Sequence, residues 1–217
     1  MTLEFDLFWS FRSPYSYLAT GRIVEMTKRY DLRVNFRPVY PLAIRKEDFF
    51  KTVNPLWPRY VLLDIVRVSQ MLGIPLDWPQ PDPIVMDPET LEVSKEQPYI
   101  HRLVRLGIEA ASSGKGLAFA DEVSKVIWSG NVKNWHEGNH LNGAAARAGL
   151  DLKEMDKAIA ARPEHCDTIA AENQKALEEA GHWGVPTMVF KGEPFFGQDR
   201  LDVLLWRLKQ HGLAEKK

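Results

Sequence analysis

The stretch LEFDLFWSFRSPYSYLAT, residues 3–20, carries the pattern that decides the fold. Its first seven residues are mostly apolar, as expected for a buried strand. Pro14 then stands where the first residue of a helix is expected, and Ser13 precedes it as the capping residue. We expect this helix to run to about Tyr30, and the alternating residues 32–39 predict a second strand. A connection of this length implies that the two strands are parallel.

The length and composition are those of an ordinary globular protein. The chain has 217 residues, 45% hydrophobic and 26% charged, which is enough for one domain with a sizeable insertion. A net charge of -1 gives no basic surplus that points to nucleic acid. The apolar runs are too short to cross a membrane, and the first ten residues do not have the pattern of a signal peptide. The single cysteine, Cys166, fits a reducing compartment, so we expect a cytoplasmic protein without nucleic-acid or membrane partners.

The middle of the chain predicts helices and no strand. Residues 58–73 carry apolar side chains at helical spacing, and residues 75–98, with six prolines, predict a long ordered loop. Asp151 with Glu154 three residues later has the pattern of a capping box. Further helices are predicted at 99–114, 117–129, 135–149, 151–161 and 166–180.

The strand pattern returns near the end of the chain. Residues 186–190 and 194–197 predict a hairpin, and the residues 199–212 that follow predict a closing helix. The order is therefore β-α-β, a helical block, then β-β-α. Because neither half forms a complete sheet alone, we predict an α/β fold with a helical insertion. Residues 1–40 and 182–217 would form one domain, and residues 41–181 would be a linking segment and the insertion.

Ser13 and Ser16 stand where a redox Cys-x-x-Cys turn would have its two sulfur atoms. Ser13 lies where a strand ends and a helix begins, which is where open α/β sheets bind ligands. The free N–H groups and the helix dipole at that point favour an anion such as a thiolate. For a Ser-Pro pair taken alone, a plain helix cap is the better interpretation.

Val185-Pro186, just before the first strand of the hairpin, also has two interpretations. A trans proline at a strand edge is favoured, because cis bonds are a small minority even before proline. The functional alternative is a cis bond. It would turn the N–H and C=O of Val185 outward, where they could pair with a peptide ligand like a short strand.

The order of elements and four short motifs together resemble a known family. A β-α-β, helical, β-β-α order with a CxxC-like turn looks like the thioredoxin fold with a DsbA-type insertion. The motifs SPYSYL (13–18), GIPL (73–76), GVPT (184–187) and FFGQDRL (195–201) resemble the 2-hydroxychromene-2-carboxylate isomerases and their relatives, the kappa-class glutathione transferases. The resemblance covers essentially the whole chain. It implies that glutathione supplies the sulfur that the turn lacks.

The resemblance also implies roles for five residues. It puts Ser13 at the catalytic position, where its hydroxyl would hydrogen-bond the glutathione thiolate. Val185 would bind the cysteinyl backbone, and Gln198 and Asp199 would meet the γ-glutamyl end, where an acid suits the amine. Asn54 matches a family asparagine near the glycyl end of glutathione. Two structural alternatives remain open: Asp199 as a helix cap and Asn54 as a turn residue.

Other side chains near these motifs are weaker candidates. A family lysine beyond the asparagine is missing here, and Arg59 is a guess for its replacement. Tyr15 lies inside the turn and is a candidate substrate contact. Large aromatic residues are usually core, and we expect this of each candidate for the wall of the second substrate's pocket. These candidates are Phe11, Trp57, Trp78, Trp183 and Phe195.

The histidines and the cysteine predict no metal site and no reactive thiol. His136 and His140 have a spacing that binds zinc on a helix, but no acid or thiol partner is evident and Gly138 interrupts the helix. His101 gives no stronger pattern. Cys166 follows His165 directly, and neighbouring residues of a helix do not face each other. We therefore expect a packed cysteine.

The resemblance implies a glutathione-dependent isomerase that acts on an aromatic keto acid, as the 2-hydroxychromene-2-carboxylate isomerases do. The thiolate would add to a conjugated enone, allow rotation, and leave again. A kappa-like glutathione transferase and a non-catalytic glutathione-binding protein are the alternatives. A disulfide oxidoreductase is disfavoured, because serine cannot form a mixed disulfide. Since such relatives are commonly dimers, we expect a homodimer.

Overall fold

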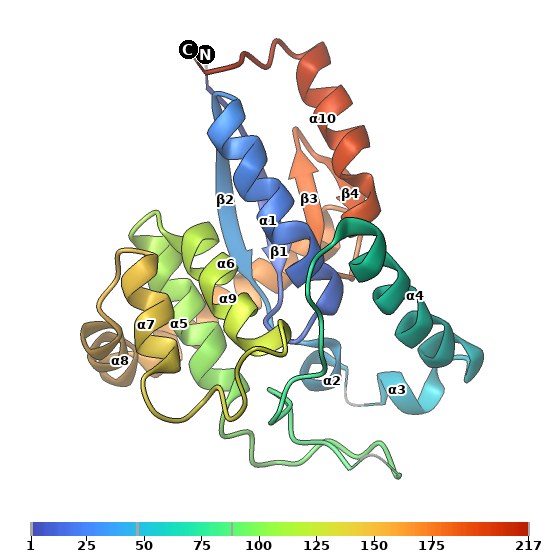
Figure 1. Cartoon of the computed structure of the whole chain (residues 1–217), viewed down its shortest axis with the longest axis vertical. Helices are drawn as coiled ribbons and strands as arrows, with labels where there is room; N and C mark the ends of the chain where they lie inside the picture. The colour runs from blue at the N-terminus through green and yellow to red at the C-terminus, as the bar shows by residue number, and fades with distance from the viewer. Residues whose placement is uncertain (1, 47, 88, 217) are drawn as a thin grey trace.

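A four-stranded sheet of order β2-β1-β3-β4 forms the centre of the structure (Figure 1). It is seen in a computed structural model that describes residues 2–46, 48–87 and 89–216. β1 runs parallel to β2 and antiparallel to β3, and β3 pairs antiparallel with β4. The predicted parallel pair and closing hairpin are therefore confirmed. The strands are β1 (Leu3–Trp9), β2 (Leu32–Pro38), β3 (Thr187–Phe190) and β4 (Glu193–Phe196).

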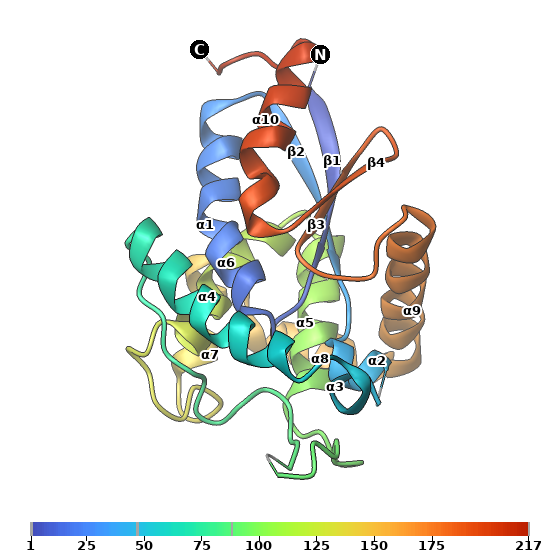
Figure 2. The ribbon, with the colours of Figure 1, turned by 90° about the vertical axis from the view of Figure 1, so that its right-hand side faces the viewer.

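Helices cover both faces of this sheet. Successive side chains of a strand point to opposite faces, so Trp9 and Phe8 of β1 enter different clusters. The Trp9 indole donates to Thr20 Oγ of α1 (Pro14–Arg29) at 2.9 Å. Phe8 lies on the opposite face of the sheet and packs against Leu177 of α9 (Pro163–Glu179). Figure 2 shows α1 and α10 (Leu201–Gln210) on one side of the sheet and α9 on the other.

The chain between β2 and β3 is helical, as predicted. Helices α5 and α6 pack on β2, and α6 also packs on α1, so the insertion shares one core with the sheet (Figure 1). A Cβ atom on Gly116 of α6 would lie 2.7 Å from the Phe36 ring, which shows how closely helix and sheet approach. The domain limits at residues 40/41 and 181/182 stay a prediction. These helices are α2 (Leu42–Arg45), α3 (Phe49–Thr52), α4 (Leu56–Leu72), α5 (Ile100–Ser112), α6 (Gly116–Trp128), α7 (His140–Arg147) and α8 (Leu152–Ala161).

One predicted helix is wrong over its first third. The sequence predicts a helix at 135–149, but α7 begins at His140. Asn134 and Gly138 have φ values of 50° and 57°, and this left-handed conformation cannot continue a right-handed helix. The Asp151 cap of α8 is confirmed, because Asp151 Oδ1 accepts hydrogen bonds from the N–H groups of residues 153 and 154. The reciprocal half of the predicted capping box is not found in the described residues, since the Glu154 carboxylate pairs with Lys157.

One further boundary differs from the prediction, and two short helices are additional. The helix predicted from residue 166 begins at Pro163, where proline occupies the first helical position and loses no hydrogen bond. The single turns α2 and α3 were not predicted, because four residues are too few to show a helical period.

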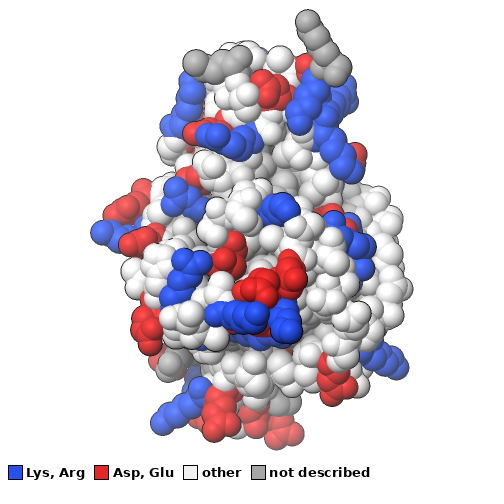
Figure 3. Space-filling model, turned by 90° about the vertical axis from the view of Figure 1, so that its left-hand side faces the viewer, with Lys and Arg blue, Asp and Glu red and all other residues white. Residues whose placement is uncertain are grey.

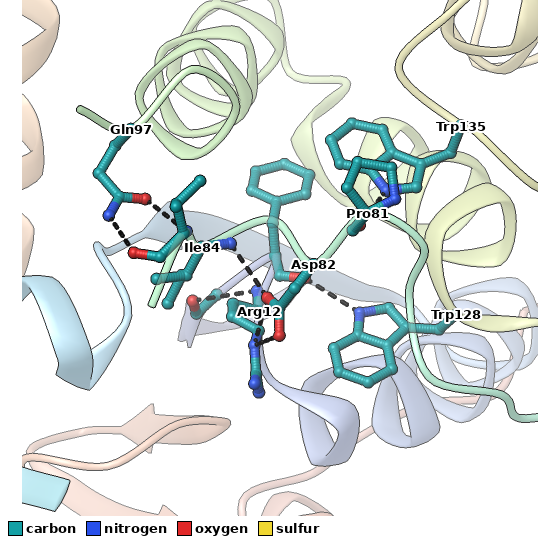
Figure 4. A network of polar contacts seen from close by, with 10 residues as sticks. Arg12, Pro81, Asp82, Ile84, Gln97, Trp128 and Trp135 are labelled. Atoms are coloured by element: carbon teal, nitrogen blue, oxygen red, sulfur yellow. Dashed lines mark hydrogen bonds and ion pairs between the residues drawn. The ribbon is translucent and has the colours of Figure 1, made fainter. Parts of the chain in front are cut away.

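Side chains from within the long proline-rich loop, residues 75–98, and from beyond it hold the loop in place (Figure 4). The Gln97 amide clamps the backbone of Val85, donating to its carbonyl at 2.8 Å and accepting from its N–H at 2.9 Å. The Trp135 indole donates to the Pro81 carbonyl at 2.7 Å. Over its described residues, 75–87 and 89–98, these contacts confirm the predicted ordered loop.

The surface carries charges of both signs. Figure 3 shows lysine and arginine interspersed with aspartate and glutamate over one side of the molecule, without a large field of either sign. Among the residues that the structure describes, no helix has the length and hydrophobicity needed to cross a bilayer.

Candidate active site

Ser13 connects the end of the sheet to the start of α1. Its Oγ accepts a hydrogen bond from the Ser16 N–H at 3.1 Å, which confirms the predicted helix cap. The same hydroxyl donates to the carbonyl oxygen of Val185 at 3.4 Å, 172 positions along the chain. Two residues that the sequence singled out for separate reasons therefore meet.

The Val185-Pro186 peptide bond is cis, so the favoured expectation of a trans bond is wrong here. Tertiary contacts on both sides fix the segment and outweigh the general preference. The Thr187 hydroxyl donates to the Gly184 carbonyl at 2.7 Å, and the Gly197 N–H donates to the Pro186 carbonyl at 2.9 Å.

Two backbone donors beside this contact have no protein acceptor. Within residues 2–46, 48–87 and 89–216, neither the Tyr15 N–H nor the Val185 N–H forms a hydrogen bond. Tyr15 belongs to the first turn of α1, where the helix dipole adds partial positive charge. With the Ser13 hydroxyl, these groups give three donors for an anion. The site is therefore suited to stabilise a thiolate rather than to form a disulfide.

The side chain of Tyr15 fixes α4 next to the start of α1. Its hydroxyl donates to Asp64 Oδ2 at 2.6 Å, and the Tyr60 hydroxyl lies 3.3 Å from the other carboxylate oxygen. Burial, followed by the bond to Asp64, raises the pKa of Tyr15 above its ordinary value. The charge of Asp199 contributes to the higher pKa of Tyr15 in the same direction. A role of Tyr15 toward substrate stays a prediction.

Gln198 and Asp199 lie in a 3-10 turn (Gln198–Arg200) between β4 and α10, with different environments. Gln198 is buried, and its backbone and side-chain oxygens accept from Arg22 Nη1 at 2.8 and 3.1 Å. Asp199 has a side chain that is 58% exposed and pairs with Arg200 at 3.0 Å. Gln198 thus anchors the turn to α1, and Asp199 presents a carboxylate that a ligand can reach.

Asn54 and Arg59 lie farther out. Asn54 is exposed, and its Oδ1 accepts from the Leu56 N–H at 3.0 Å as α4 begins, which confirms its role as a turn residue. Arg59 is exposed on α4. In the described part of the chain neither residue contacts Ser13 or Val185, so their parts in binding stay predictions.

The five aromatic candidates divide into core and surface. Phe11 and Phe195 are buried, as expected for core residues. The expectation of core positions is wrong for the three tryptophans: Trp57, Trp78 and Trp183 are 38%, 38% and 39% exposed. They sit at the start of α4 and in connecting segments.

The exposed tryptophans form two groups. Trp57 and Trp183 both lie against the ring of Phe49, with centroids 5.7 and 5.5 Å away. The other group consists of Trp78 on the proline-rich loop and Arg12, whose guanidinium carbon lies 4.5 Å from the Trp78 ring centroid. Arg12 directly precedes Ser13, and Trp183 precedes Val185 by two residues. One aromatic group therefore adjoins Ser13 in the fold of the chain, and the other adjoins Val185.

Sequence reasoning missed Arg45, which supports the segment before Val185. Its guanidinium donates to the Trp183 carbonyl at 3.0 Å and to the Tyr40 carbonyl at 2.6 Å. Burial lowers the pKa of Arg45 to about 10. Nothing in the sequence around α2 marks this contact, which joins residues 138 positions apart.

His182 was also missed, although it lies just before the GVPT motif. Its Nδ1 accepts a hydrogen bond from the Gly184 N–H at 2.9 Å, and its ring stacks on Phe196 at 3.9 Å between centroids. Burial lowers the pKa of His182 below its ordinary value of 6.5. The neutral ring thus holds the loop that leads to Val185.

This arrangement predicts a pH dependence of stability. A histidine whose pKa is lower in the folded than in the unfolded chain binds its proton first in the unfolded state. The free energy of unfolding should therefore fall as the pH drops below about 6.5, and His101, whose pKa burial also lowers, acts in the same direction. In His182→Asn the amide oxygen can accept the same N–H without titrating, so the fall should be shallower.

Urea unfolding between about pH 7 and pH 5 measures this slope. The matched control is His165→Asn, since His165 is exposed on α9. It should keep the wild-type profile. A His182→Asn profile as steep as that of the wild type would contradict the assignment.

The remaining histidines and Cys166 do not form a cluster. In the described residues, no three His, Cys, Asp or Glu side chains come together as metal ligands would. His101 Nδ1 lies 3.2 Å from the Tyr40 hydroxyl. Cys166 is buried, as expected for a packed cysteine, and burial raises the pKa of its thiol.

Comparison with known proteins agrees with this fold. The family model of the DSBA-like thioredoxin domain matches residues 4–209. The chain belongs to the DSBA-like thioredoxin domain family. The resemblance to isomerases within it is confirmed: a 2-hydroxychromene-2-carboxylate isomerase of Sphingobium xenophagum is 24% identical over 94% of this chain and 97% of its own length.

Solved structures share the fold. A 2-hydroxychromene-2-carboxylate isomerase superposes with a TM-score of 0.69 at 21% identity, over 96% of this chain and 95% of its own. The cytosolic disulfide reductase DsbM from Pseudomonas aeruginosa, in a structure with GSH, has a TM-score of 0.58 at 13% identity, over 95% of this chain and 100% of its own. Proteins named as an isomerase and as a disulfide reductase thus share this fold.

Proposed function

We propose that this protein is a glutathione-dependent isomerase of the 2-hydroxychromene-2-carboxylate isomerase type. The single observation that carries the proposal is the contact of the Ser13 hydroxyl with Val185 at the amino end of α1. It provides an alcohol in place of the first redox cysteine. Ser16 replaces the second cysteine, and the protein's own Cys166 is buried, so the sulfur must come from outside.

The residues around the turn offer hydrogen-bonding and charged groups that match the parts of glutathione. The open Val185 N–H can pair with the backbone of the cysteinyl unit. The exposed Asp199 carboxylate suits the γ-glutamyl amine, and the Gln198–Arg22 contact fixes the turn that carries it. The structure of DsbM with GSH, on the same fold, supports this choice of ligand.

The chain's part in the reaction is to stabilise and orient a sulfur anion. The Ser13 hydroxyl, which now donates to a backbone carbonyl, would turn to donate to the thiolate. The Tyr15 N–H and the dipole of α1 would share the charge. Glutathione supplies the nucleophile, which adds to a conjugated enone, permits rotation about the resulting single bond, and is released unchanged. Exposed aromatic side chains beside the turn would orient the second substrate.

An assay that follows substrate, product and glutathione together tests the proposal. The protein is incubated with 2-hydroxychromene-2-carboxylate, with and without glutathione, and all species are separated by chromatography and mass spectrometry. We expect the open-chain trans isomer to form only with glutathione, at constant total glutathione. Accumulation of a released adduct would instead indicate a transferase. Binding without turnover over a panel of enones and electrophiles would indicate a binding protein.

Gly197→Ala tests the placement of Asp199. Gly197 has a φ of 106°, and an added Cβ would collide with Asp199 Oδ1. We expect a loss of about 1–3 kcal/mol in stability from the backbone conformation, and about a tenfold weaker binding of glutathione from the displaced carboxylate. Urea unfolding and titration calorimetry measure the two effects.

Gly192→Ala is the matched control for this variant. Gly192 lies between β3 and β4 with a φ of 82°, and an added Cβ there meets no atom within 4 Å. It should lower stability in the same way and leave the affinity for glutathione unchanged. Equal affinities in the two variants would show that Asp199 does not bind the ligand.

A further inference from the structure

Arg12, which directly precedes Ser13, is held rigidly by the proline-rich loop. Its Nε lies 2.7 and 3.0 Å from the two carboxylate oxygens of Asp82. Asp82 is itself fixed, because its Oδ1 accepts from the Ile84 N–H at 3.0 Å. The guanidinium stacks on Trp78 at 4.5 Å and lies 5.9 Å from the Trp128 ring. The side chain is only 17% exposed, so its orientation is set by the fold.

The other edge of this guanidinium is not used by the protein. Within the part of the chain that the structure describes, no hydrogen bond or ion pair engages either Nη atom of Arg12. Neither atom is a buried donor without a partner, so solvent or a ligand can reach that edge. In Figure 4 the terminal nitrogens point away from Asp82 and from the other residues of the network.

A guanidinium fixed in this way is a preformed site for a planar carboxylate. Its Nη atoms present two parallel donors, which match the two oxygens of a carboxylate. Because Asp82 and Trp78 already restrict the side chain, little conformational entropy is lost when a ligand binds. The neighbouring Trp78 ring, 38% exposed, adds an aromatic surface beside the charge. A fixed guanidinium beside an aromatic ring suits a ligand that carries both a carboxylate and an aromatic ring.

We propose that the Nη edge of Arg12 binds the carboxylate of the second substrate, with Trp78 beside the substrate's aromatic ring. The inference rests on the proposed function and adds the residue that selects aromatic 2-oxo acids over neutral enones. Arg12 directly precedes Ser13 in the chain, which places the carboxylate site and the proposed thiolate site on adjacent residues. The acid group would thereby orient the double bond for attack.

Binding of a matched pair of ligands tests this role. The acid is benzylidenepyruvate, and the neutral control is its methyl ester. Dissociation constants are measured by quenching of tryptophan fluorescence, without glutathione, so that no turnover is needed. For the wild type we expect the acid to bind about 10- to 100-fold more tightly than the ester, as for a charge-assisted pair of hydrogen bonds. In Arg12→Met this preference should disappear, while binding of the ester is retained.

Two further variants separate recognition from support of the loop. Asp82→Asn removes the carboxylate that holds the loop but keeps the Arg12 charge, so the preference for the acid should remain. Arg12→Lys should restore part of the preference that Arg12→Met loses. If Arg12 only supports the loop, Arg12→Met and Asp82→Asn will weaken acid and ester alike, and this result would overturn the inference. Equal binding of acid and ester by the wild type would also overturn it.

The ligand-binding result is independent of the proposed reaction. A protein that binds the acid through Arg12 but does not isomerise it would contradict the proposed function and leave the subsite standing. A protein that isomerises acid and ester with equal KM values would support the proposed function and contradict the carboxylate subsite at Arg12.

Discussion

Ser13→Ala is expected to reduce glutathione-dependent turnover by about 100-fold or more, the usual effect of removing one donor to a reacting anion. The Ser13 hydroxyl lies at the start of α1 and donates to the Val185 carbonyl. Without it the bound thiol should lose a proton less readily, while the peptide contacts of glutathione remain. We therefore expect kcat to fall far more than the affinity for glutathione. Steady-state kinetics and titration calorimetry separate the two quantities.

This variant also removes a helix cap, and a matched variant isolates that effect. Loss of the Ser13 cap should lower stability by about 1 kcal/mol. Asp151 caps α8 with hydrogen bonds to two N–H groups, and Asp151→Ala should cause a similar loss. We expect Asp151→Ala to keep wild-type turnover. If both variants keep it, Ser13 is a structural residue and the proposed mechanism is wrong.

Trp128→Ala is expected to lower the free energy of unfolding by about 3–5 kcal/mol, the range for buried aromatic residues. Trp128 ends α6, is fully buried, and its indole donates to the Phe11 carbonyl at 3.0 Å, just before Arg12 and Ser13. Its own carbonyl accepts from the Asp77 N–H at 2.8 Å. It therefore joins the insertion, the long loop and the turn that carries Ser13.

Two companion variants separate the contribution of the buried ring from that of the indole hydrogen bond and from the loss of any tryptophan. Trp128→Phe keeps a large apolar ring but leaves the Phe11 carbonyl unpaired, which should lower stability by about 1–3 kcal/mol. Trp206→Ala removes a tryptophan that is 53% exposed on α10, and its effect should stay within about 0.5 kcal/mol. Urea unfolding followed by far-UV circular dichroism measures all three. A Trp128→Ala loss as small as that of Trp206→Ala would show that this contact does not support the turn.

Most of the fold could be predicted because its signals are local. The apolar run of β1, the Ser13-Pro14 cap and the Asp151 cap each lie within a few residues, and each is found where it was expected. The error at residues 135–139 arose because positive φ values at Asn134 and Gly138 outweigh a helical composition. The resemblance to the isomerases depended on four motifs in the same order. No single motif would have indicated the family.

The site was harder to predict because its contacts span the chain. The sequence marked Ser13 and Val185 separately, and only the fold shows that they touch. The contact of Arg45 with the Trp183 carbonyl and that of Arg12 with Asp82 join segments that share no pattern. The exposure of the tryptophans depends on which helices lie over them.

A crystal structure with bound glutathione is the most direct test of the central claim, that Ser13 holds an external thiolate where a redox cysteine would stand. We expect the glutathione sulfur within hydrogen-bond distance of Ser13 Oγ, and the cysteinyl backbone paired with Val185. A structure with the sulfur elsewhere, or no uptake of glutathione at saturating concentration, would contradict the account.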